Sequence, residues 1–165
     1  MADTQTGVRV TLADEGSANV TTGVTVLDHL VGELARSGRF AILLEVAPER
    51  ADQAVPAAGR ALGGAIRELL AAGRGWAILP SDEALAAAAV EQADRPMLAS
   101  NVDFSDQRVG GLGNDVASQF LRELVEAAGL NMHVRLIEGT EPQHVLAAIF
   151  KAVGAALGQA CRPST

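Results

Sequence analysis

The chain has 165 residues, of which 48% are hydrophobic and only 3% aromatic, and its formal net charge is −7. This length suits one compact domain or two small halves that share a core. The acidic balance argues against a nucleic-acid or anionic-membrane surface, because such binding depends on clustered Lys and Arg. The low aromatic content predicts a core built from Ala, Val, Leu and Ile.

The single cysteine, Cys161, excludes an internal disulfide framework and a thiolate metal cluster, which fits a reducing compartment. We interpret it as a small apolar side chain rather than a reactive thiol. The N-terminus lacks the basic segment and apolar run of a secretory signal. No apolar run reaches the ~18 residues that a membrane helix needs. We therefore expect a soluble, cytoplasmic protein.

In the first half, strands and helices are expected to alternate. Residues that alternate between apolar and polar predict strands, and apolar residues three and four apart predict helices. From the N-terminus, the expected elements are strands at Val8–Leu12 and Ala18–Thr22, a helix at Leu27–Ser37, a buried strand at Phe40–Val46 and a helix at Gly59–Ala72.

The middle of the chain is expected to hold a strand at Trp76–Leu79, a helix at Ala84–Glu91 and a strand at Arg95–Asp103. Ser81, Asp82 and Glu83 precede the expected helix, where they would cap it and favour its dipole. Trp76 is interpreted as a core or interface residue. The Gly-rich stretch Arg108–Asn114 is expected to be a loop, and it lacks the spacing of a phosphate-binding fingerprint.

The second half repeats the order of the first. A helix is expected at Asn114–Ala128, a strand at Leu130–Ile137 and a helix at Pro142–Cys161. An ungapped offset of 90 aligns Glu33 with Glu123 and Gln53 with Gln143, among other identities. We predict a single domain, residues 1–165, with internal repeats at approximately 27–72 and 117–162. The expected fold class is α+β, with two similar halves whose helices pack on sheets.

Few residues have the spacing of a reactive site. The histidines His29, His133 and His144 lie beside apolar residues, where a hydrogen-bonded structural role is commoner than metal binding. Asp82 and Glu83 are acid–base candidates, but helix capping explains them more simply. The basic side chains Arg95 and Lys151 are equally compatible with an anion site and with ordinary surface charge.

Several motifs in this order resemble the imidazoleglycerol-phosphate dehydratase family, the manganese-dependent lyases of histidine biosynthesis. They are TGVTVLDHL (residues 22–30), PSDEAL (80–85), DRP (94–96), RVGG, GLNMHVRLIEG and PQHVLAAIFKAVGAAL. The resemblance runs from about Gly7 to Pro163. It implies two similar α+β halves with helices between sheets, and trimers that assemble into a 24-subunit shell.

The resemblance also implies two manganese ions between subunits. Their ligands in the family are the histidines of LDHM and HVRL and two H-H-x-x-E sets, one in each repeat. Here the first set falls on Gln53, Ala54 and Ala57, and the second on Gln143, His144 and Ala147. Three of the eight donors remain, namely His29, His133 and His144. On the phosphate side, Arg95 and Lys151 match family positions, and Arg74 alone represents an expected arginine pair.

Two hypotheses follow. The first is a catalytically silent relative without manganese that serves as an assembly or binding module. It would be a homo-oligomer, with a trimer expected and an assembly smaller than the full shell, or a partner of an active paralogue. The alternative is an active dehydratase, or a lyase for a related phosphorylated ligand, that uses a reduced site. That site would hold Arg95, Lys151 and the three histidines, with manganese as cofactor and Glu83 as a weak candidate for acid–base chemistry.

Overall fold

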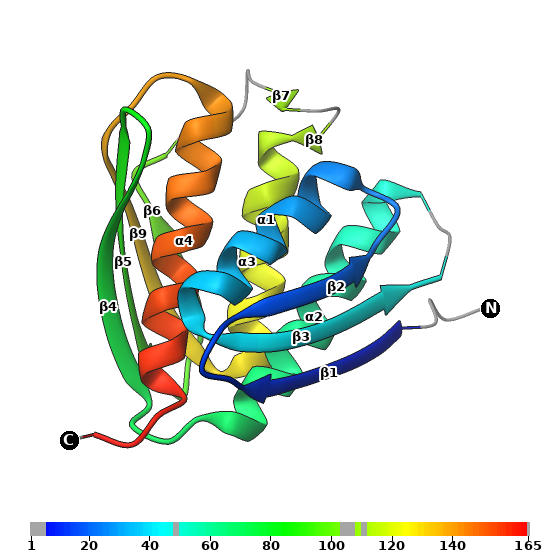
Figure 1. Cartoon of the computed structure of the whole chain (residues 1–165), viewed down its shortest axis with the longest axis vertical. Coiled ribbons are helices and arrows are strands. Elements are labelled where there is room, and N and C mark those ends of the chain that lie inside the picture. The colour runs from blue at the N-terminus through cyan, green and yellow to red at the C-terminus, as the bar shows by residue number, and fades with distance from the viewer. Residues whose placement is uncertain (1–5, 48–49, 103–107, 110–111, 165) are drawn as a thin grey trace.

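The computed structural model describes residues 6–47, 50–102, 108–109 and 112–164. Within them, two sheets enclose four helices, so the helices lie between the sheets (Figure 1). The expected α+β class, with helices packed between sheets, is confirmed.

The first half contains one sheet and two helices. Its elements are β1 (Thr6–Leu12), β2 (Ser17–Thr21), α1 (Thr25–Gly38), β3 (Phe40–Val46) and α2 (Ala51–Leu69). The sheet has the order β1-β3-β2, with β1 antiparallel and β2 parallel to the central strand β3. Both helices pack on this sheet, α1 against β2 and β3, and α2 mainly against β1.

The second half builds the other sheet. Its elements are β4 (Arg74–Ser81), β5 (Ala84–Gln92), β6 (Met97–Ser100), β7 (Arg108–Val109), β8 (Leu112–Gly113), α3 (Asn114–Ala128), β9 (Leu130–Glu138) and α4 (Pro142–Ala160). The main sheet has the order β4-β5-β9-β6, and β7 and β8 form a separate small pair. The helices α3 and α4 cover the inner face of the main sheet.

The two halves face each other through their helices. The helix α1 packs against α4, and α2 packs against α3. Elements recur in the same order. The strand β3 begins at Phe40 and β9 at Leu130, an offset of 90 residues. The helices α2 and α4 match at an offset of 91. The strands β1 and β2 correspond to β5 and β6 at an offset of 80. The strand β4 is the one element of the main sheet without such a counterpart among the described residues. The order of elements is the observation, and duplication as its origin stays a prediction.

The prediction of a helix at Ala84–Glu91 is wrong, because these residues form the strand β5. Alanine favours helices, but propensity is a weak preference that tertiary packing overrides. Here β5 lies between β4 and β9, and its inward side chains Ala84, Ala86 and Ala88 are buried beneath α4. The expected capping role of Ser81, Asp82 and Glu83 is wrong for the same reason. Ser81 pairs with Ala84, so Asp82 and Glu83 form the tip of a hairpin.

Other boundaries also differ from expectation. The helix α2 begins at Ala51, eight residues before the predicted start at Gly59, and it includes Pro56. The residues from Ala51 to Ala58, which lie before the predicted helix, therefore belong to α2. The Gly-rich segment Arg108–Asn114 contains β7, β8 and the first residue of α3, whereas Gly110 and Gly111 lie outside the described residues. Asp103, the predicted end of a strand, is also outside them.

No helix in the described part of the chain is long and apolar enough to cross a membrane.

Candidate functional site

The densest cluster of ionisable groups joins the β4–β5 hairpin to the first turn of α4. Asp82 and Glu83 form the hairpin tip, and the positive φ of 53° at Asp82 lets the chain reverse within two residues. Glu83 Oε1 contacts Nδ1 of His144, and Asp82 Oδ2 lies 3.4 Å from Nε2 of the same ring. The imidazole is therefore held between two carboxylates, and Glu141, the residue before α4, adds a further negative charge.

These carboxylates raise the pKa of His144 above its ordinary value. The largest cause is the hydrogen bond to Glu83, which raises the pKa. Partial desolvation comes next and lowers it, and the negative charges of Glu83, Asp82 and Glu141 then raise it further. Each ring nitrogen faces a different carboxylate, so the oxygens do not converge on one point as metal ligands would. The geometry suits a protonated imidazolium that ties the hairpin to α4.

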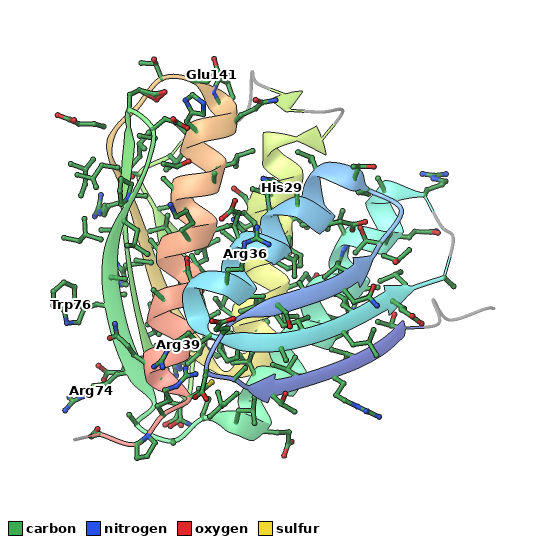
Figure 2. The ribbon with its side chains drawn as sticks, in the orientation of Figure 1. His29, Arg36, Arg39, Arg74, Trp76 and Glu141 are labelled. Atoms are coloured by element: carbon green, nitrogen blue, oxygen red, sulfur yellow. The ribbon has the colours of Figure 1, made fainter. Side chains whose placement is uncertain are left out.

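His29 lies on the exposed side of α1, apart from this cluster (Figure 2). Its Nε2 is 3.6 Å from Glu33 Oε1, and the same carboxylate oxygen lies 3.5 Å from Nη2 of Arg36. The three residues are three and four positions apart, so they share one helix face. His29 thus has a local surface partner within its own helix.

His133 lies on the outer face of the main sheet. Its neighbours along β9, Met132 and Val134, are buried, so alternation turns the imidazole to the opposite, exposed side. The predicted histidines therefore sit on α1, on β9 and on α4 of one chain. No three His, Cys, Asp or Glu side chains of the described residues are grouped so as to hold a metal ion.

The positions expected to carry the first H-H-x-x-E set, Gln53, Ala54 and Ala57, lie on α2, but the structure corrects this alignment. The helices α2 and α4 match at an offset of 91, as do the crossing glycines Gly63 and Gly154. The α2 residues that correspond to Gln143, His144 and Ala147 are therefore Asp52, Gln53 and Pro56.

These positions supply few metal ligands. Asp52 and Gln53 are exposed, and Pro56 is buried, as are Ala54 and Ala57. On α4, Gln143 is exposed and Ala147 is partly exposed. Apart from His144, only the Asp52 carboxylate is a ligand that manganese prefers, and it is paired with Arg50.

The three basic residues expected to bind phosphate are not brought together. Lys151 Nζ donates a hydrogen bond of 2.7 Å to the carbonyl of Pro80, near the end of β4. Arg74 opens the same strand, roughly 20 Å away at the usual rise of a strand. There it lines an open hollow of about 720 Å³ with Trp76 and Gln159. Arg95 is exposed in the turn between β5 and β6.

Trp76 is not a core residue, because 66% of it is exposed. Figure 2 shows its ring pointing away from β4. Its backbone is held in place by Gln159 of α4, a contact that the sequence did not indicate. Trp76 N–H donates to Gln159 Oε1 at 3.0 Å, and Gln159 Nε2 donates to the Trp76 carbonyl at 2.7 Å. The expected interface role of Trp76 stays a prediction.

The hydrogen bonds of two further polar residues, Asp28 and Arg162, were not predicted from the sequence. Asp28 Oδ1, in the first turn of α1, accepts hydrogen bonds from Thr22 N–H at 3.0 Å and from Thr22 Oγ1 at 2.5 Å. This contact explains the joint presence of both residues in TGVTVLDHL. Arg162 donates to four backbone carbonyls, those of Ala13, Gly38, Arg39 and Gly158. Neither pattern has a spacing that identifies it before the fold is known.

The match to a known family decides what these motifs represent. The model of the family described as imidazoleglycerol-phosphate dehydratase matches residues 22–157, most of the chain. The chain belongs to the imidazoleglycerol-phosphate dehydratase family. The resemblance carried by the sequence motifs is thereby confirmed.

Individual relatives agree with this family assignment. An imidazoleglycerol-phosphate dehydratase of Desulfitobacterium hafniense is 38% identical over 170 residues, which cover 97% of this chain and 86% of the relative. A dehydratase of Pelobacter propionicus is 33% identical over 96% of this chain and 86% of its own length. The crystal structure of the Staphylococcus aureus dehydratase superposes with a TM-score of 0.87 at 27% identity, covering 97% of this chain and 95% of that one.

The family implies manganese, but the residues of this chain do not fit a manganese pair. On α2 an amide stands at Gln53 and a proline at Pro56, and on α4 an amide stands at Gln143 and a methyl group at Ala147. A buried divalent ion needs carboxylates that offset its charge, and the side chains at these positions supply none.

Proposed function

We propose that this family member has lost manganese and dehydratase chemistry and persists as an oligomeric assembly or binding module. The main support is the loss of both glutamates of the H-H-x-x-E sets, whose positions hold Pro56 on α2 and Ala147 on α4. Metal-assisted elimination needs a cation that stabilises developing charge, and neither glutamate position offers such a cation a carboxylate. Methyl groups packed in a core are stable there, whereas a partly filled ligand set would leave buried polar groups unpaired.

The assembly part of the proposal is supported by the outer face of the main sheet. Large apolar side chains are exposed on its strands, namely Trp76, Ile78, Met97 and Ile137. Exposed apolar groups that gather on one face are typical of protein–protein interfaces. We propose a homo-oligomer, with a trimer expected and an assembly smaller than a 24-subunit shell, located in the cytoplasm. An active paralogue is the alternative partner, and neither nucleic acid nor membrane is expected to bind.

One observation favours the second candidate function, an enzyme with a reduced site. His144 and Glu83 are in contact at the surface, so a proton could pass between them and a bound ligand. An active dehydratase, or a lyase for a related phosphorylated ligand, would use this pair together with the basic residues. The separation of Arg74, Lys151 and Arg95 counts against this reading, because one phosphate group cannot contact all three within one chain.

Complementation distinguishes the two functions. The chain is expressed in a histidine auxotroph that lacks its own imidazoleglycerol-phosphate dehydratase, with an active family member as the positive control. The proposal expects no growth without histidine, although the protein accumulates in folded form. Growth that depends on this chain would overturn the silent reading. A further loss of growth in Glu83→Gln would then assign the chemistry to the hairpin cluster.

A further inference from the structure

The strand β4 forms one edge of the main sheet and pairs with β5. In an antiparallel pair, residues whose N–H and C=O groups face the partner strand alternate with residues whose groups face away. Both backbone groups of Trp76 bond to Gln159 of α4, so they face away from β5. The carbonyl of Pro80, four residues further on, bonds to Lys151 of α4, which agrees with this alternation. The backbone groups of Ile78 therefore face the edge as well.

The composition of β4 makes this edge prone to association with other chains. The segment Trp76–Leu79 is entirely apolar, and Trp76 and Ile78 are 66% and 49% exposed. An exposed apolar edge strand offers its unpaired backbone groups to other chains, and segments of this kind are common sites of aggregation. A shield at this edge would therefore keep separate chains from joining their sheets.

The helix α4, which runs beside β4, supplies such a shield (Figure 1). At Trp76, the Gln159 amide accepts from the N–H at 3.0 Å and donates to the carbonyl at 2.7 Å, as the backbone of a neighbouring strand would. At Pro80 the ring removes the N–H, and Lys151 Nζ occupies the carbonyl at 2.7 Å. Only Ile78 lies between these two blocked positions, and one residue is too short a stretch for another strand to pair.

The strand β9 shows the same arrangement where β6 ends. The last residue of β6, Ser100, pairs with Val134, so the next backbone groups of β9 on that side belong to Leu136. Leu136 N–H donates to Oδ1 of Asn101 at 2.8 Å, and Asn101 Nδ2 donates to the Leu136 carbonyl at 3.2 Å. In the described part of the chain, two primary amides thus stand in for a strand residue at the main sheet.

We infer that Gln159 is an edge cap that prevents β4 from pairing with β4 of a second copy of this chain. Every copy carries the same edge, so a second copy is the partner that is always present. The cap engages the Trp76 backbone and leaves its ring exposed on the outer face of the sheet. The oligomer proposed above would then form through that face and not through this edge. This consequence rests on the proposed oligomer, whereas the cap itself does not.

Light scattering of variants at position 159 tests the cap. Gln159→Leu removes both hydrogen bonds and opens the edge from Trp76 to Ile78, so we expect the mass to at least double relative to the wild type. Gln159→Glu, the matched control, also loses the bond to the Trp76 carbonyl. Its charge at the edge opposes pairing, so it should keep the wild-type mass. An unchanged mass in Gln159→Leu, or the same increase in Gln159→Glu, would overturn the inference.

A second control separates edge pairing from added apolar surface. Gln92→Leu places the same side chain at an exposed position of β5 and leaves the cap intact. It should keep the wild-type mass, and an increase equal to that of Gln159→Leu would contradict edge pairing.

Amide hydrogen exchange of the wild type tests the cap without any substitution. Gln159 should protect the Trp76 N–H, whereas no group of the described residues bonds to the Ile78 N–H. We expect Ile78 to exchange at least tenfold faster than Trp76, although both lie on one strand. Equal protection of the two amides would mean that another strand covers the edge, and it would contradict the cap.

Discussion

A Cβ atom placed on Gly154 of α4 would lie 2.2 Å from the carbonyl oxygen of Leu34 on α1. The two helices therefore cross with their backbones in contact, and only glycine fits at this point. The other helix pair meets similarly, because a Cβ on Gly63 would lie 2.3 Å from the carbonyl of Leu124. Leu34 and Leu124 are 90 residues apart. The close approach of α1 to α4 and of α2 to α3 is thus shared by both halves.

Gly154→Ala is expected to destabilise the protein by about 2 kcal/mol or more, since a backbone carbonyl blocks the new methyl group. Gly64 is the matched control. It lies beside the crossing glycine Gly63 on α2, but a Cβ there meets nothing within 4 Å. Gly64→Ala should stabilise α2 by roughly 0.5–1 kcal/mol, because alanine favours a helix interior. Thermal unfolding of both variants measures the difference, and equal losses would contradict the close crossing.

His144 should titrate above the ordinary histidine pKa of ~6.5, because Glu83 and Asp82 hold the charged ring. A histidine whose pKa rises on folding adds stability at low pH, and this contribution is lost as the pH rises through the folded-state pKa. Glu83→Gln should lower the His144 pKa more than Asp82→Asn does. An NMR titration of the imidazole protons gives the His144 pKa in the wild type and in both variants. An unchanged pKa in Glu83→Gln would exclude the contact as its cause.

A carboxylate placed in the core of α2 should be costly. Ala57→Glu would bury a charged side chain in a packed core, at an expected loss of about 3 kcal/mol or more. Ala147→Glu, at the matched glutamate position of α4, should cost less, because Ala147 is partly exposed. Denaturant unfolding of the two variants compares these costs directly. If Ala57→Glu were as stable as the wild type, Ala57 would not be part of the core.

Arg162 ties the ends of two helices to the turn after β1. Its guanidinium donates to four carbonyls at 2.9–3.2 Å, and burial lowers its pKa from the ordinary value. Arg162→Met removes these bonds while keeping much of the apolar stem, and we expect a loss of about 2–4 kcal/mol. Arg36→Met on the exposed face of α1 is the control and should change stability little. Denaturant unfolding measures the free energy of unfolding of Arg162→Met and Arg36→Met and so compares the two losses.

The fold was predictable where periodicity was strong. The strand Phe40–Val46 and the helix Asn114–Ala128 have the bounds that their apolar patterns indicate. The strand β5 was missed because its alanines favour a helix locally, and only its place between β4 and β9 decides otherwise. The early start of α2 was missed because Pro56 is rarely found inside a helix.

The site was predictable only in part. The motifs identified the family and the positions of His144 and Glu83, but the contact between them joins residues 61 positions apart. Helix capping was the simpler explanation of Glu83 until the hairpin was known. The backbone contacts of Gln159 and Arg162 have no sequence signal at all, because any polar side chain at those positions looks like ordinary surface.

Manganese binding by the purified protein tests the central claim most directly. The folded protein is dialysed against Mn²⁺ and its metal content is measured per chain, with an active family member treated in parallel. Loss of the glutamate ligands at Pro56 and Ala147 predicts no stoichiometric manganese in this chain, whereas the active relative retains it. Two tightly bound manganese ions per chain would contradict the account.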